Sequence, residues 1–306
     1  MVTHWCPACL HNNEALPVDR VVRQNHNSTE RAPPVYRLPG LSIRATAVVV
    51  ENAEQEFPDW DRGVGRPKAL TLRDVLRLSL CRLRRNATYN DLHEDFGVAA
   101  STAWGYHQKM VAFLAEVLGT TDEDLPALLS GKICLIDGTL VPTFNWRHRK
   151  DLLSGKHRKH GVNLQVFVDV HGRLIAISPA NPGSWHDIHC LREAGWVDLL
   201  KQIDNALGDT GYIGEPDALN TPIKKKPRID LTDQQKEYNT GFSRIRVAVE
   251  WAIGHLKNWR ILATRYRSDL SRIDTDARAV LGLQKLNEQF SERRLTFDRI
   301  KSAVSE

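Results

Sequence analysis

The stretch KICLIDGTLVPT, residues 132–143, has the pattern of a buried β-strand that contains an acidic residue. Successive side chains of a strand point to opposite faces, so Leu135 and Asp137 share one face while Cys134 and Ile136 share the other. Burying an unpaired carboxylate costs several kcal/mol. We therefore expect either that Asp137 lies just past the end of the strand or that something pairs with it, and the candidate partners are a turn, an arginine and a metal ion.

The composition is that of an ordinary globular protein. Of the 306 residues, 42% are hydrophobic and 26% are charged, and the length predicts two folded units. Every apolar run is shorter than the roughly 18 residues that a membrane-spanning helix needs, and the N-terminus has no signal-peptide pattern. The five cysteines, an odd number, do not indicate a disulfide framework. These features predict an intracellular, reducing location.

Positive charge is concentrated in two segments of the chain. The net charge is +5, and the isoelectric point is near 9.0. Residues 147–160, RHRKDLLSGKHRKH, carry six Lys or Arg and three His against one Asp, and residues 224–228 read KKKPR. Such clusters suit a polyanion such as nucleic acid, although a solvated loop has the same composition.

The first half of the chain is largely helical in its pattern. Within the irregular residues 1–61, the segment LSIRATAVVV (41–50) favours one short strand. Residues 69–85 have apolar side chains at helical spacing, and residues 88–111 have the pattern of a helix-turn-helix. Its second helix begins with Ser101 as the expected N-cap, so Ser101, Thr102 and Trp104 lie near the end that would enter a DNA groove. The alternative is a plain helical hairpin.

The second half alternates between strands and helices. We expect strands at 133–137, 162–170, 173–179 and 205–209, a short helix from about Asp187, and a long helix over 240–258.

Three acidic residues stand out in this half. Asp137 and Asp209 follow short apolar strands, and Glu250 lies beside the apolar stripe of the long helix. Mg²⁺ prefers oxygen ligands from carboxylates, water and phosphate, and a pair of such ions can support cleavage of a phosphodiester. The alternatives are local: each Asp could sit in a turn with a nearby glycine, and Glu250 could pair with Arg246 one turn before it.

Four motifs together resemble a known family. IDGT (136–139), NPGSWHD (181–187), GDTGY (208–212) and RVAVEWAIGHLKNWR (246–260) are similar to the DDE-superfamily transposases of the Harbinger-like insertion-sequence group. The resemblance covers roughly residues 66–265.

The resemblance implies an α/β fold, in which an RNase H-like catalytic domain with a mixed central sheet follows a helical helix-turn-helix region. Asp137, Asp209 and Glu250 would bind Mg²⁺, or Mn²⁺, and carry out hydrolysis of double-stranded DNA at transposon ends, followed by joining of the 3′-OH to target DNA. The expected domains are residues 1–61, 62–120, 127–265 and a helical extension at 266–306. The implied location is the cytoplasm, in association with the nucleoid, and self-association is expected because transposases commonly act as multimers.

Several further residues are candidates for supporting roles. Asp187 suits the first turn of a helix, where the helix dipole stabilises it, and with His186 it is expected to face the site beside the ligands. The alternative is a direct catalytic role for Asp187. DNA phosphates are expected to contact basic residues near the site: Arg149, Lys156, Lys159 and Lys257.

Other readings of the chain remain open. Cys6 and Cys9, flanked by His4 and His11, could bind Zn²⁺, but no second ligand pair follows at a familiar spacing. Cys81, Cys134 and Cys190 lie in apolar contexts typical of a core. The alternative functions are a catalytically inactive DNA-binding regulator derived from a transposase, and a metal-dependent phosphoesterase acting on other substrates.

Overall fold

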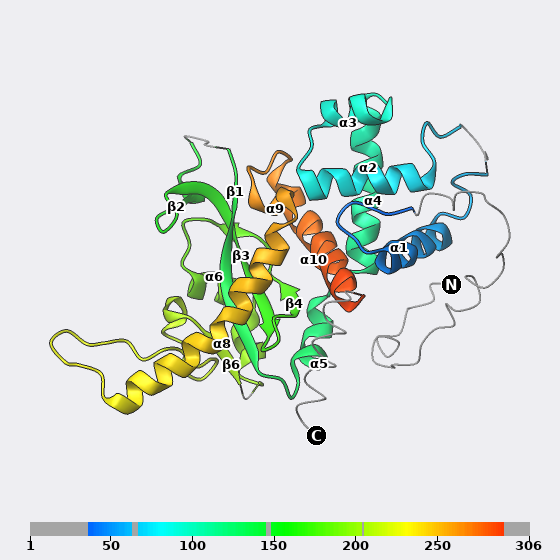
Figure 1. The fold of residues 1–306 in the computed structure, drawn as a ribbon. Helices are drawn as coiled ribbons and strands as arrows, with labels where there is room; N and C mark the ends of the chain where they lie inside the picture. The colour runs from blue at the N-terminus through cyan, green and yellow to red at the C-terminus, as the bar shows by residue number, and fades with distance from the viewer. Residues whose placement is uncertain (1–35, 63–66, 145–147, 204, 291–306) are drawn as a thin grey trace, which may run out of the picture. The chain divides into compact units, whose positions relative to one another are not determined.

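The computed structural model describes residues 36–62, 67–144, 148–203 and 205–290 (Figure 1). The predicted Cys6–Cys9 zinc site lies outside these residues. The described chain forms one compact unit that starts at Tyr36. No helix in the described ranges is long and apolar enough to cross a membrane.

Helices precede and follow a central sheet. The helices are α1 (Ile43–Glu56), α2 (Leu72–Arg85), α3 (Tyr89–Phe96), α4 (Ala100–Val117), α5 (Leu125–Leu129), α6 (Asp187–Glu193), α7 (Trp196–Leu200), α8 (Asp233–Lys257), α9 (Arg260–Ala263) and α10 (Ile273–Gln289). The strands are β1 (Cys134–Pro142), β2 (Leu153–Ser154), β3 (Lys159–Asp169), β4 (Leu174–Ile177), β5 (Asn181–Pro182) and β6 (Ala206–Gly208).

The sheet is mixed, as the family resemblance implied. Its strand order is β2-β3-β1-β6, with β4 and β5 also paired to β3. β1 and β3 are antiparallel, whereas β1 and β6 are parallel and pair only over Cys134–Ile136 of β1. The parallel neighbour β6 therefore ends one residue before Asp137 of β1.

The two faces of the sheet belong to different hydrophobic clusters. Leu135 and Val166 pack in the cluster that contains residues of α8 and α10, while Ile136 and Phe167 pack in the cluster with α6 and α7. Figure 1 shows α8 lying across one face of the sheet. The alternation predicted for residues 133–137 is confirmed.

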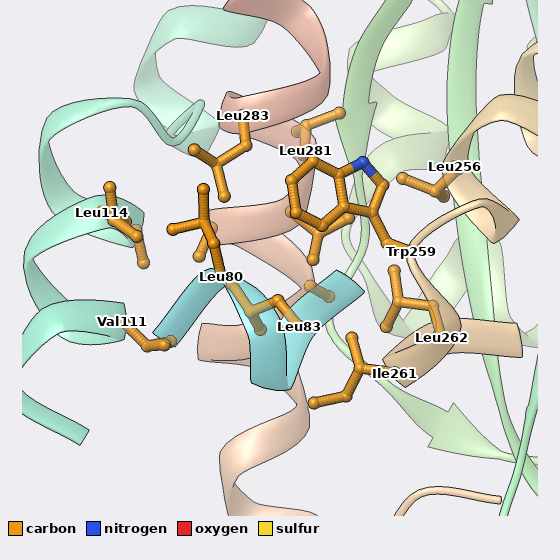
Figure 2. Close-up of a cluster of buried hydrophobic side chains, with 14 of the residues drawn as sticks. Leu80, Leu83, Val111, Leu114, Leu256, Trp259, Ile261, Leu262, Leu281 and Leu283 are labelled. Carbon is orange, nitrogen blue, oxygen red and sulfur yellow. The ribbon is translucent and has the colours of Figure 1, made fainter. Parts of the chain in front are cut away.

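The N-terminal helices share a core with this sheet domain. Trp259, which is fully buried, belongs to the same cluster as Leu83 of α2, Leu114 of α4 and Leu281 of α10 (Figure 2). Its indole Nε1 donates a hydrogen bond of 2.9 Å to Gln284 on α10. Packing therefore joins the helical region to the rest of the described chain.

The strand predicted within residues 41–50 is wrong, because this segment is part of α1. The Ser42 hydroxyl caps the helix by accepting from the N–H of Ala45, and the buried residues Ala45, Val49 and Ala53 recur at four-residue spacing. The β-branched residues favour a strand intrinsically, but burial of one helical face outweighs that preference.

Candidate active site

Asp137 lies within β1 and does not end it, contrary to the prediction. It is opposite Val166 of β3, and the strand continues through Gly138, which is opposite Gln165, so the expected turn is absent. The Asp137 side chain is only 13% exposed. A carboxylate can be placed here because β6 ends opposite Ile136 and leaves the edge of β1 open beside it.

Asp209 follows β6 directly and caps a short 3₁₀ turn. Its Oδ1 accepts a hydrogen bond of 2.7 Å from the N–H of Gly211. The turn that the sequence offered as an alternative is therefore present, but it leaves the other carboxylate oxygen available for a second partner.

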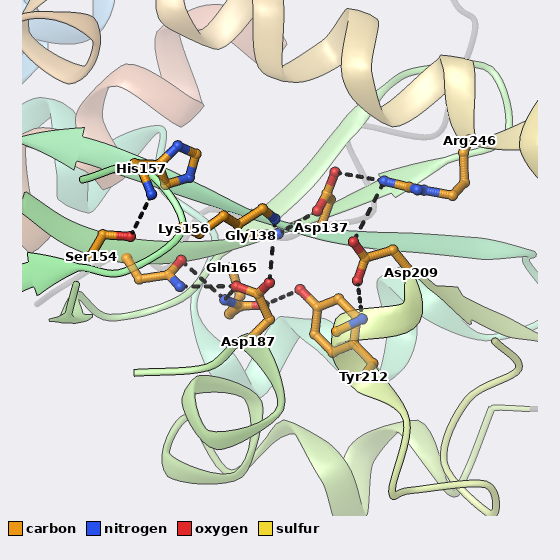
Figure 3. A network of polar contacts seen from close by, with 12 residues as sticks. Asp137, Gly138, Ser154, Lys156, His157, Gln165, Asp187, Asp209, Tyr212 and Arg246 are labelled. Atoms are coloured by element: carbon orange, nitrogen blue, oxygen red, sulfur yellow. Dashed lines mark hydrogen bonds and ion pairs between the residues drawn. The ribbon is translucent and has the colours of Figure 1, made fainter. Parts of the chain in front are cut away.

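Arg246 of α8 brings these two aspartates together (Figure 3). Its Nη2 donates to Asp137 Oδ2 at 3.2 Å and lies 3.9 Å from Asp209 Oδ2. Burial, followed by the charge of Asp209, raises the pKa of Asp137, whereas the guanidinium of Arg246 acts in the opposite direction. Two carboxylates from separate strands thus share one cation.

Asp187 lies closer to these groups than the sequence suggested. It begins α6, and Asn163 Nδ2 donates to its Oδ1 at 2.9 Å. A Cβ atom at Gly138 would lie 2.2 Å from this oxygen, and one at Gly211 would lie 3.1 Å from the other oxygen. The carboxylate therefore fits between the glycines that follow Asp137 and Asp209, and Figure 3 shows all three aspartates around one region.

Two buried side chains below the site were missed by the sequence reasoning. Gln165 of β3 donates to Asp187 at 3.4 Å, and its Oε1 accepts from the hydroxyl of Tyr212, which is fully buried. Burial and the nearby aspartates raise the pKa of Tyr212, so it remains a hydrogen-bond donor. The alternation of polar and apolar residues in VNLQVFV (162–168) is the signal that could have identified Asn163 and Gln165.

Glu250 is placed differently from the two aspartates. It lies one helical turn beyond Arg246 on α8, and its side chain is exposed. The ion pair with Arg246, which was the alternative to a metal-binding role, does not form, because Arg246 contacts Asp137 instead. Among the residues that the structure describes, no three His, Cys, Asp or Glu side chains converge as a metal-binding group.

The basic candidates differ in their surroundings. Lys156 Nζ lies 3.9 Å from Asp187 and is otherwise exposed, whereas Arg149 is paired with Asp151 at 2.7 Å. Lys159 is exposed at the start of β3. Lys257 donates to the carbonyl of Leu140 at 2.5 Å, so its ammonium points into the protein, and burial there lowers its pKa.

His186 and the three described cysteines lie in different environments. His186 is exposed as the residue before α6, without a side-chain capping bond. Cys81, Cys134 and Cys190 are free and buried, as predicted for core residues.

The helix-turn-helix is formed by α3 and α4. The Thr88 hydroxyl and the Asp91 carboxylate cap α3 reciprocally, and Gly97 ends it with a φ of +68°. The second helix begins earlier than predicted, with Ala99 in place of Ser101 at the N-cap. Ser101 and Trp104 are exposed near this end and Thr102 is partly exposed.

Two family models match the chain in the regions just described. Residues 136–285 match the DDE superfamily endonuclease, and residues 68–120 match the helix-turn-helix of DDE superfamily endonuclease. The first match begins one residue before Asp137 and includes Asp209 and Glu250. The chain belongs to the DDE superfamily of transposases.

A relative with a transposase name supports this assignment. The chain is 25% identical, over 257 residues, to the probable transposase for insertion sequence element IS702 from Microchaete diplosiphon. The match covers 81% of this chain and 91% of the relative. No solved structure matches the chain at a comparable level of significance.

Proposed function

We propose that this protein is a transposase of the Harbinger-like group that cuts DNA at the ends of its element and joins the freed 3′-OH to target DNA. The observation that carries the proposal is the sharing of Arg246 by Asp137 and Asp209, because it places two acids from different strands at one open sheet edge. The mixed sheet followed by α8 fits an RNase H-like domain, and the helix-turn-helix suits binding of the element ends.

A divalent cation, Mg²⁺ or Mn²⁺, would be held by Asp137 and Asp209, with Glu250 as the third proposed ligand. The chemistry of the donors fits such an ion, since carboxylate oxygens are hard ligands and already attract the cation of Arg246. When bound, the metal would activate water and neutralise charge on the phosphate. Asp187, held by Asn163, is proposed to position these groups, with His186 at the rim.

The remaining proposals concern the surroundings of the site. Lys156 and Lys159 lie on the β2–β3 segment that borders the site and are proposed to contact DNA phosphates. Arg149 and Lys257 are proposed to do the same after Arg149 leaves Asp151 and Lys257 leaves the carbonyl of Leu140. A protein that acts on chromosomal DNA is expected in the cytoplasm, in association with the nucleoid. We also propose that the protein self-associates, because transposases commonly act as multimers.

The proposal is tested with a nicking assay on supercoiled DNA that carries the element's ends, in the presence of Mg²⁺ or Mn²⁺. Asp137→Asn, Asp209→Asn and Glu250→Gln should each abolish cleavage while DNA binding remains close to that of the wild type, because the removed charges contact the metal and not the DNA. Arg244→Gln, on the exposed side of α8, serves as a control and should cut normally.

Cleavage by any of the three variants at the wild-type rate would remove that residue from the proposed mechanism. If the wild-type protein binds the ends without cutting them under any metal, the catalytically inactive regulator is the correct function. Hydrolysis of small phosphate esters without cutting of DNA would favour the phosphoesterase.

A further inference from the structure

A basic segment lies against the helix-turn-helix. The connector, which we define as residues 260–272 between the start of α9 and the start of α10, has four arginines: Arg260, Arg265, Arg267 and Arg272. All four side chains are exposed. Within the described part of the chain, no ion pair engages them, in contrast to Arg149, Arg173 and Arg192.

The connector and α4 border a common depression of about 450 Å³. Trp104 and Gln108 of α4 line one side, and Arg267 and Arg272 of the connector line the other. The Arg272 guanidinium lies 5.9 Å from the centroid of the Trp104 ring, a cation–π contact that holds it beside the exposed end of α4. A second depression of about 400 Å³ continues past Arg267.

The connector is fixed in this place by hydrogen bonds to α2 and its C-cap. Asn86 Nδ2 donates to the carbonyl of Arg265 at 2.9 Å, and Arg82 Nη2 donates to the hydroxyl of Ser268 at 2.9 Å. Side chains that are exposed on a pinned backbone lose less freedom on binding than those of a loose loop, which favours a binding role.

Three carboxylates line the two depressions, and two of them, Asp269 and Asp91, hold backbone N–H groups, while the third is Asp95. Asp269 accepts a hydrogen bond of 2.9 Å from the N–H of Ser271, and Asp91 accepts one of 2.7 Å from the N–H of Thr88. Asp91 and Asp269 also act electrostatically on Arg267 and Arg272. Neither forms an ion pair with them among the described residues, so the exposed guanidinium groups can still meet an external anion.

We propose that Arg267 and Arg272 extend the helix-turn-helix into a larger surface for double-stranded DNA, in which they contact phosphates beside the groove that α4 enters. This inference rests on the proposed function, in which α4 addresses the element ends. The partner is duplex DNA because the recognition helix and the arginines lie side by side, and the phosphates of a duplex flank the groove that a helix occupies. Arginine matches a phosphate with two parallel donors.

The test measures binding of the full-length chain to a fluorescent 30-base-pair duplex of random sequence, from low to high salt. Each phosphate contact contributes about 0.9 to the slope of log K against log salt concentration. Arg267→Ala and Arg272→Ala should each reduce the slope by about 0.9, and the double variant by about 1.8. The double Arg→Lys variant should retain most of the slope, because it keeps the charges.

Arg44→Ala is the matched control, since Arg44 is an exposed arginine of α1 that lines neither depression. A double alanine variant with the slope and affinity of Arg44→Ala would overturn the inference, and so would a wild-type chain that does not bind the duplex. Lost slope in the double variant, together with no cutting by the wild-type chain, would support the DNA surface while refuting the proposed nuclease. Thermal unfolding of each variant verifies that the fold is intact.

Discussion

Arg246 is the residue on which the electrostatics of the site depend. Two aspartates lie beside its guanidinium. Burial and the charge of Asp209 raise the pKa of Asp137, and the guanidinium opposes this increase. Replacing Arg246 with Gln removes the opposing charge, so the pKa of Asp137 should rise more. We expect Arg246→Gln to lower the melting temperature at pH 7, because no guanidinium then opposes the burial of the Asp137 charge, and to have little effect near pH 4.

The direction of this pH dependence follows from proton binding by Asp137. An acid whose pKa is higher in the folded chain binds its proton more readily there, so stability falls as pH rises from the unfolded pKa through the folded pKa. Thermal unfolding between pH 4 and pH 8 measures the difference, with Arg244→Gln as the control. Added Mg²⁺ should raise the melting temperature of Arg246→Gln more than that of the wild type; equal shifts would contradict a cation site between the aspartates.

The elements β1 and α8 each contain a glycine, and the two glycines differ in the space around them. Gly138 of β1 faces Asp187, whose oxygen would be 2.2 Å from a new Cβ, whereas nothing lies within 4 Å of one at Gly254 of α8. Gly138→Ala should displace Asp187 and abolish cleavage. Gly254→Ala should leave the site unchanged and stabilise the helix by about 0.5–1 kcal/mol.

The nicking assay and chemical denaturation measure both variants side by side. Wild-type cleavage by Gly138→Ala would show that the position of Asp187 is unimportant for the reaction. A loss of cleavage in Gly254→Ala, with stability intact, would instead indicate that DNA approaches α8 at this glycine.

Local elements were predictable where their signals are local. The helix-turn-helix could be predicted from Thr88 and Gly97, and the long helix from its apolar stripe, although it starts earlier at Asp233 because Thr232 and Gln235 form a capping box. The helix over Ile43–Glu56 was missed, since its β-branched residues favour a strand until a core exists to bury one face.

The site was predictable only in part, because its geometry depends on distant segments. Asp137 and Asp209 were identified from the apolar residues before them. The position of Asp137 within β1 could not be predicted, since it depends on where β6 stops. The contact of Arg246 with both aspartates also could not be read from the sequence, where Glu250 was its nearest acidic partner.

At the scale of the molecule, one hydrophobic cluster joins the DNA-binding helices to the sheet domain. Trp259 is fully buried between α2, α4 and α10. Trp259→Ala should lower the free energy of unfolding by about 3–5 kcal/mol, because a large buried side chain leaves a cavity. We expect the described helices and sheet to unfold in a single transition, in the wild type and in the variant.

Denaturant unfolding followed by both circular dichroism and tryptophan fluorescence measures this cooperativity. Trp104→Ala is the control, since Trp104 is 48% exposed and its loss should cost little. Two separated transitions in the wild type would show that the helix-turn-helix folds independently of the sheet.

The connector also touches the strand that contains Asp137. The N–H of Tyr266 donates to the carbonyl of Pro142 at 2.7 Å, and Tyr266 also bonds Asp276 of α10 at 2.7 Å. Through Arg272 beside Trp104 and Tyr266 bonded to Pro142, the connector links α4 to β1. If the protein cuts DNA as proposed, this link would fix the number of base pairs between the sequence that α4 contacts and the bond that is cut.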